Sequence, residues 1–96
     1  SSDLTDEVTI SGIATDDTGV RDVIVYRGSQ KVAYAGGGTE TAPLTSVPFS
    51  ATAALEPGNN LLVVLVRDVN GLTTTQAVSV YRPPATTVAA QGTKAP

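Results

Sequence analysis

The longest apolar run in the chain is LLVVLV at residues 61–66. It is short and rich in β-branched residues, which indicates a strand rather than a helix. Successive side chains of a strand point to opposite faces, so alternate residues of this run belong to opposite faces, and both are apolar. The pattern predicts a central strand with one face in a core and the other still needing a cover.

Turn residues flank this strand on both sides. Before it, Glu56-Pro57-Gly58-Asn59 suits a type I or II turn, because proline presets φ and Gly or Asn accepts positive φ. After it, Asn70-Gly71 predicts a hairpin with a type I′ turn, whose two central residues both need positive φ. The returning strand is expected over residues 73–81.

Four more strands are expected upstream, because alternation of polar and apolar residues recurs between turn signals. They cover residues 7–15, 20–27, 30–35 and 47–55. Pro48 suits an edge strand, and the glycine-rich segment 36–46 is expected to be a flexible loop.

Short strands, frequent turns and no helical pattern predict an all-β sandwich of six or seven antiparallel strands over residues 1–82. Residues 83–96, PPATTVAAQGTKAP, have the composition of a disordered tail.

Two sequence patterns carry a resemblance. The first is Leu55-x-Pro57-Gly58-x-Asn60-x-Leu62-x-Val64-x-Val66-x-Asp68-x-x-Gly71, which resembles the last hairpin of bacterial immunoglobulin-like domains. The second is Gly19-Val20-x-Asp22-Val23-x-Val25-Tyr26, together with Val80-Tyr81-Arg82 at the end of the last strand. With these residues the chain is most similar to one group of such domains. That group is the C-terminal accessory domain of PDZ-containing tail-specific (C-terminal processing) serine proteases.

The resemblance spans residues 8–82 and implies an immunoglobulin-like β-sandwich. The strands that begin near Val20, Leu61 and Thr73 would share one sheet, and those near Glu7 and Val47 the other. It also implies a bacterial protein in the periplasm or outside the cell. The chain would be a fragment of it, with the catalytic serine and lysine of the protease elsewhere.

Composition narrows the function classes. The net charge is −3 and the six Lys and Arg residues are dispersed, which argues against nucleic-acid binding. No apolar run is long enough to span a bilayer, so no membrane insertion is expected. The chain contains no His and no Cys, which removes the commonest acid–base groups, nucleophile pairs and zinc ligands. We expect no catalytic residues and no cofactor.

Glycines 36–38 do not form a phosphate-binding loop, because the Lys-Ser/Thr pair that should follow them is missing.

Oxygen-bearing residues of two turns are expected at one end of the sandwich. They are Asp16, Asp17, Asp68 and Asn70. Such a group could coordinate calcium. The competing interpretation is that the aspartates cap their own turns. The chain lacks a spaced D-x-D-x-D loop, so capping is favoured and these four are only weak candidates for a metal site.

Alternation also leaves an apolar outer face. If Val23, Val25, Leu62, Val64, Val66, Val78 and Val80 fill the core, the opposite face carries Ile24, Tyr26, Leu61, Val63, Leu65 and Tyr81. Scattered exposed aliphatic residues are ordinary, but a contiguous set on three adjacent strands is less so. This set is the candidate docking patch, with another domain of the parent protein or a second copy as the expected partner.

The sequence therefore favours a non-catalytic accessory or interaction module of a larger bacterial envelope protein, with a processing protease as the parent. The alternative is a ligand-binding module of a secreted or surface protein, for carbohydrate or for calcium-dependent adhesion. Carbohydrate binders usually present exposed aromatic residues, especially Trp, and this chain has no Trp.

Overall fold

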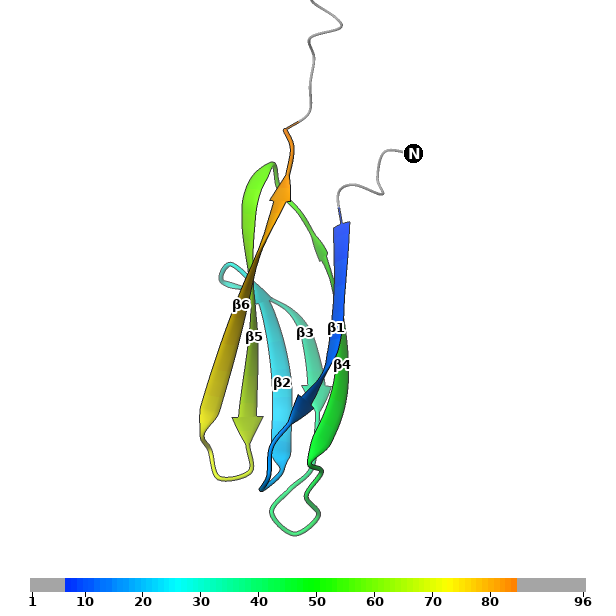
Figure 1. Ribbon diagram of the computed structural model, residues 1–96, viewed down its shortest axis with the longest axis vertical. Helices are drawn as coiled ribbons and strands as arrows, with labels where there is room; N and C mark the ends of the chain where they lie inside the picture. The colour runs from blue at the N-terminus through cyan, green and yellow to red at the C-terminus, as the bar shows by residue number, and fades with distance from the viewer. Residues whose placement is uncertain (1–6, 85–96) are drawn as a thin grey trace, which may run out of the picture.

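The computed structural model describes residues 7–84, which form six β-strands and no helix (Figure 1). The strands are β1 (Glu7–Thr15), β2 (Val20–Arg27), β3 (Gln30–Gly36), β4 (Ser46–Ala54), β5 (Gly58–Asp68) and β6 (Thr73–Arg82). The predicted all-β class is confirmed. Of the predicted C-terminal tail, residues 85–96 lie outside the described part of the chain.

The strands form two antiparallel sheets. One has two strands in the order β1-β4, and the other has four in the order β3-β2-β5-β6. The predicted membership of both sheets is confirmed, and β5 is the central strand that its two apolar faces indicated. The β1–β4 register runs without a shift from the Glu7–Ala54 pair to the Thr15–Ser46 pair.

The smaller sheet covers only part of the larger one. β4 packs across β3 and β2, and β1 packs across β2. β6 stands at the far edge of the larger sheet, away from β1 and β4 (Figure 1). The layers are therefore closed along the β3–β4 side and open between β1 and β6.

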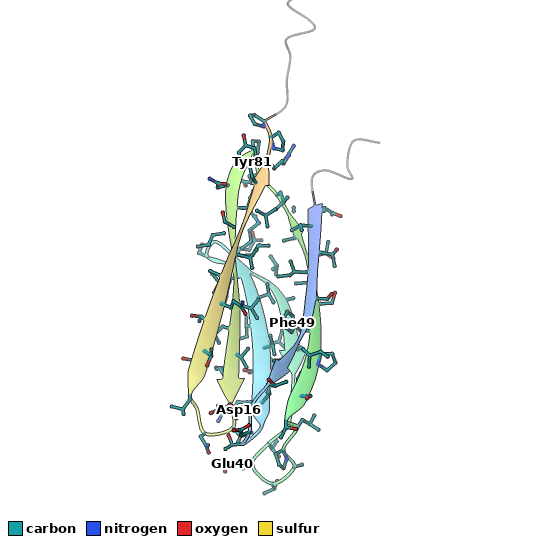
Figure 2. The ribbon with its side chains drawn as sticks, in the orientation of Figure 1. Asp16, Glu40, Phe49 and Tyr81 are labelled. Carbon is teal, nitrogen blue, oxygen red and sulfur yellow. The ribbon has the colours of Figure 1, made fainter. Side chains whose placement is uncertain are left out.

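The core lies beneath the smaller sheet. Val20 and Val23 on β2 are completely buried and cluster with Ala14 of β1 and Val47 of β4. Phe49 lies between the sheets (Figure 2), over Gly12 of the paired strand. A Cβ at Gly12 would meet the Phe49 ring at 3.1 Å, so this glycine leaves room for the ring.

One predicted core residue is not in the core. Val78 pairs with the buried Leu62 and so shares its inward face, yet its side chain is 42% exposed. Alternation fixes the direction of a side chain, but burial requires an opposing layer. β6 lies beyond the cover of the smaller sheet, which leaves Val78 open and Val80 only half-buried.

The β5–β6 hairpin is confirmed, but the predicted type I′ turn is wrong. Gly71 has φ +91° and no residue other than glycine has positive φ in the described residues, so Asn70 does not. The Gly71 N–H donates to the Asp68 carbonyl at 3.0 Å, and the Asp68 N–H donates to the Leu72 carbonyl at 2.9 Å. This is a type I turn closed by a glycine bulge. The turn is displaced by one residue because Val69 is buried and its N–H donates to the Gly19 carbonyl.

The segment 36–46 is not the free linker that its glycines suggested. The N–H groups of Gly37 and Gly38 donate to the carbonyls of Arg21 and Val20, both at 2.8 Å. A Cβ at Gly37 would lie 2.2 Å from the Val20 carbonyl oxygen. These glycines therefore allow a close approach of two backbones, and the segment lies along the start of β2.

Candidate functional site

The outer face of the larger sheet carries the candidate docking patch. In the register of β2 and β5, Ile24 lies opposite Leu65 and Tyr26 lies opposite Val63. Side chains of directly opposed residues share a face. The prediction that these residues occupy one face of the sheet is therefore confirmed.

The members of the patch differ in exposure. Leu61 is 51% exposed and Tyr81 is 60% exposed, whereas Tyr26, Val63 and Leu65 are half-buried. Leu61 lies opposite Ser79 on β6, two positions from Tyr81, so the two exposed side chains are diagonal neighbours. They form an exposed apolar end of this face, with Val63 next along β5.

Ile24 is not part of the exposed surface. It is only 8% exposed, because β3 adds a neighbour that the prediction omitted: Tyr34 lies directly opposite Ile24 in the β2–β3 register. With Leu65 on its other side, Ile24 is covered by flanking side chains. It supports the patch and offers no surface to a partner.

A buried carboxylate lies at the other end of the same face. Asp22 is 2% exposed, and Arg67 reaches it from β5 with two hydrogen bonds, from Nε to Oδ1 at 2.7 Å and from Nη2 to Oδ2. The Tyr34 hydroxyl donates to Oδ2 at 3.2 Å. These bonds tie β3, β2 and β5 together.

The network stabilises the ionised form of the acid. The hydrogen bonds from Arg67 hold the pKa of Asp22 below its usual range, against the opposing effect of burial, with smaller contributions from the charge of Arg67 and from Tyr34. The same pairing raises the pKa of Arg67. Arg67 and Tyr34 both donate to the Asp22 carboxylate. The cluster therefore holds the three strands together and is not arranged for proton transfer.

A second buried polar residue fixes the turn before β5. Asn60 is buried, and its Oδ1 accepts the Glu56 N–H at 2.9 Å. Its Nδ2 group donates to the carbonyls of Glu56, Gly58 and Val80 at 2.8, 3.1 and 3.3 Å. The side-chain amide therefore acts as a backbone substitute that joins this turn to β6.

The candidate calcium ligands do gather at one end, where Figure 2 labels Asp16. The two turns touch, because the Asn70 Nδ2 lies 3.5 Å from the Thr18 Oγ1. Asp16 Oδ1 accepts the Thr18 hydroxyl and the N–H groups of Thr18 and Gly19, and these hydrogen bonds lower the pKa of Asp16. Asp68 Oδ1 accepts two backbone N–H groups, from Asn70 and Leu72, both at 2.9 Å.

Both aspartates therefore cap their own turns. Within residues 7–84, no three side chains of His, Cys, Asp or Glu lie close enough together to hold a metal ion.

A groove separates β1 from β6 on the open side of the sandwich. Its volume is about 410 Å³, and it is lined by residues 10–15 of β1, by Phe49, by Val64 and Val66 of β5, and by residues of β6 that include Gln76 and Val78. No lining residue is charged. This groove was not predicted from the sequence.

Comparison with known proteins gives no relative from which a function for these residues could be inferred. No family model, curated protein or solved structure matches the chain. Residues 7–84 contain no helix that could cross a membrane.

Two features that the sequence analysis missed had detectable signals. Asp22 sits beside the apolar stretch of residues 23–25, and Arg67 directly follows the apolar run of β5, which is the pattern of a buried ion pair across adjacent strands. The groove had a weaker signal. Residues 73–81 include no charge, which is unusual for a strand at the edge of a sheet.

Proposed function

We propose that this chain is a non-catalytic accessory module that docks onto a neighbouring domain of a larger bacterial envelope protein, or onto a second copy of itself. The observation that carries the proposal is the exposed apolar end of the outer sheet face, where Leu61 and Tyr81 lie beside Val63. Removing apolar surface from water contributes about 25 cal/mol per Å², so covering a Leu and a Tyr is a useful source of docking energy.

The polar groups of this face support binding rather than chemistry. Arg67 and Tyr34 both donate hydrogen bonds to Asp22, and the Lys31 Nζ lies over the Tyr34 ring, 5.8 Å from its centroid. A surface with an aromatic residue, aliphatic neighbours and internally paired charges is typical of a protein contact.

The resemblance to immunoglobulin-like accessory domains supports a processing protease as the parent protein, in the periplasm or outside the cell. In such a protein the reaction would take place in another domain, and this module would position that domain, its substrate or a second subunit.

Site-specific photocrosslinking in the intact parent protein tests the docking surface. A benzophenone amino acid at position 61 should crosslink to a peptide from another domain of the same protein or from a second copy, identified by mass spectrometry. Position 72 is the matched control, because Leu72 is also an exposed leucine, at 68%, but lies in the β5–β6 turn. Equal crosslinking from both positions would contradict the proposal.

A substitution provides a second test. Leu61→Lys should weaken the contact by about tenfold, because a charged group would replace apolar surface at its centre, while Leu72→Lys leaves the contact unchanged. Circular dichroism should show that both variants keep the β-fold. The interaction is measured by sedimentation for self-association, or by titration with the separately produced remainder of the parent.

The chain by itself should hydrolyse neither peptides, esters nor glycosides, because it has no His or Cys and its buried Asp22 is already paired. Steady-state assays on a substrate panel measure this. Turnover that persists through repurification and disappears in a substituted variant would show that the module is an enzyme.

A further inference from the structure

The groove between β1 and β6 has the backbone edge of β1 as one wall. Six consecutive residues of β1, 10–15, line it, whereas a wall made from one face of a strand would use only every second residue. β1 pairs with β4 alone among the described strands, so its other edge is unpaired.

The register identifies which backbone groups are available. The Asp16 N–H donates to the Thr45 carbonyl at 3.1 Å, continuing the β1–β4 register by one residue. In an antiparallel pair, residues that bond to the partner alternate with residues that point their N–H and C=O away. Even-numbered residues of β1 therefore bond to β4, and Ser11, Ile13 and Thr15 present both groups at the free edge.

The floor of the groove is the inner face of β5 and β6. Val64 lies opposite Gln76, and Val66 lies opposite Thr74, with Val78 next along β6. Val64 and Val66 are half-buried and Val78 is more than a third exposed. A strand laid beside β1 would direct every second side chain onto this floor.

The two edges beside the groove lack the features that prevent strand addition. Between Glu7 and Arg82 at their outer ends, β1 and β6 include no charged residue and no proline, and both pair without a register shift. The edges on the closed side are protected: β4 carries Pro48, and β3 carries Lys31 next to a bulge at Val25 and Tyr26. Charges, prolines and bulges are the usual means of blocking an edge.

We propose that the groove binds an extended segment of a partner polypeptide, which adds to β1 as a further strand. The segment is uncharged over about six residues, to match the uncharged wall and floor, and has a small or β-branched apolar side chain at every second position. This is β-strand addition, in which backbone hydrogen bonds supply affinity and alternate side chains supply selectivity. The site is separate from the outer-face docking patch, and either could exist without the other.

The segment that follows β6 is poorly placed to turn back into the groove. Pro83 and Pro84 directly follow β6. Proline fixes φ near −65°, so this pair cannot supply the positive φ that a tight hairpin back along β6 requires.

A second copy fits poorly as well. If the β1 strands of two copies paired antiparallel, their inner faces would point to the same side of the joined sheet. The larger sheet of the second copy would then need the space that β6 of the first copy already occupies beyond β1. The partner must therefore be a strand that carries no opposing sheet of its own.

The test uses the 96-residue chain and the peptide Lys-Thr-Val-Thr-Val-Thr-Val-Thr-Lys as the probe, followed by NMR amide exchange. Without peptide, the amides of Ser11, Ile13 and Thr15 should exchange rapidly. With peptide they should become protected by about tenfold or more, with saturable binding below about 1 mM. A peptide whose central Val is replaced by Pro is the ligand control.

Two opposed serines provide matched variants. Ser11 and Ser50 are partners in the β1–β4 register, both are exposed, and neither directs its N–H toward the other strand. Ser11→Pro should block the free edge and weaken peptide binding by about tenfold, whereas Ser50→Pro places the same change on the edge that already carries Pro48 and should leave binding unchanged. Val78→Lys, which adds charge to the floor, is a second blocking variant should Ser11→Pro not fold.

Four results would overturn the proposal. The first is no saturable binding, and the second is an equal loss of binding in Ser11→Pro and Ser50→Pro. The third is protection of the Ser11, Ile13 and Thr15 amides without peptide that is lost when residues 85–96 are removed, which would make this chain its own ligand. The fourth is such protection lost on dilution, which would indicate a second copy.

Discussion

At the scale of single residues, two of the almost fully buried side chains of this β-sandwich are polar. Asp22 accepts hydrogen bonds from β3 and β5, and Asn60 bonds to the turn before β5 and to β6. A buried polar group destabilises a fold when it is left unpaired, so both positions tolerate only side chains that keep these bonds. Alternation places Asp22 on the same face as Ile24, but its partner on β5 depends on a register that one sequence does not contain.

Replacing Asp22 should change both stability and its dependence on pH. Asp22→Asn should lower the free energy of unfolding at neutral pH by about 1.5–3 kcal/mol, because it removes charged hydrogen bonds from Arg67. The folded-state pKa of Asp22 is lowered, so its contribution is present above its unfolded pKa of about 3.9 and is lost as pH falls through the folded value.

Urea unfolding of the native chain should therefore show stability falling below about pH 4, with a shallower fall in Asp22→Asn. Asp17→Asn, at an exposed aspartate, is the control and should reproduce the native profile. Parallel profiles for the native chain and Asp22→Asn would show that the ion pair does not form in solution.

Asn60→Asp should be destabilising although it preserves shape. The carboxylate keeps an acceptor for the Glu56 N–H but loses the donor group that serves three carbonyls, at a cost of about 2–4 kcal/mol. Asn59→Asp makes the same change at the exposed neighbour and should shift the thermal midpoint little. Similar midpoints for the two variants would contradict the network.

At the scale of elements, the strand positions were predicted correctly because they depend on the alternation of polar and apolar residues. The conformations of the β5–β6 turn and of segment 36–46 were not, because tertiary contacts determine them. All six strands have the predicted positions to within a few residues, because alternation and turn residues are local signals. The β5–β6 turn differs because burial of Val69 beside Gly19 displaced it. The glycines of segment 36–46 were read as flexible because the approach of the Val20 backbone is not visible in the sequence.

The turn geometry makes a prediction that separates it from a type I′ turn. Gly71→Ala should destabilise the chain by about 1–2 kcal/mol, since φ at this position is +91°. Asn70→Ala should cost less than about 0.5 kcal/mol, since Asn70 does not adopt positive φ. Denaturant midpoints measure both, and comparable losses would restore the type I′ assignment.

At the scale of the whole molecule, the determining feature is that two strands cover four. The sequence predicted which strands share a sheet but not how far one sheet overlaps the other, because side-chain direction carries no information about the extent of the opposing layer. The exposure of Val78, the burial of Ile24 and the groove all follow from that overlap and from the position of β3. The residues proposed for the candidate docking patch therefore share one face of the sheet, but Ile24 is buried there. The groove was not anticipated.

The smaller sheet covers the larger one incompletely, and this should be measurable as a difference in stability between the same substitution at a covered and at an uncovered valine. Val25 is 1% exposed and Val78 is 42% exposed, although both point inward. Val25→Thr should cost about 1–3 kcal/mol, because it buries an unpaired hydroxyl, while Val78→Thr should be nearly neutral. Chemical unfolding of the two variants gives the comparison, and equal costs would mean that the sandwich closes over Val78 in solution.

The ends of the described chain also lie together. Glu7 is paired with Ala54, and Arg82 donates from Nη1 to the Leu55 carbonyl at 2.7 Å, so the chain enters and leaves at one end of the sandwich (Figure 1). A tensile load applied through these two ends would pull β1 and β6 sideways from their partners, opening hydrogen bonds one after another instead of shearing many at once. The module would therefore yield at low force when pulled from its own ends. In a longer protein it would project to the side of the load path and would not serve as a link that bears tension.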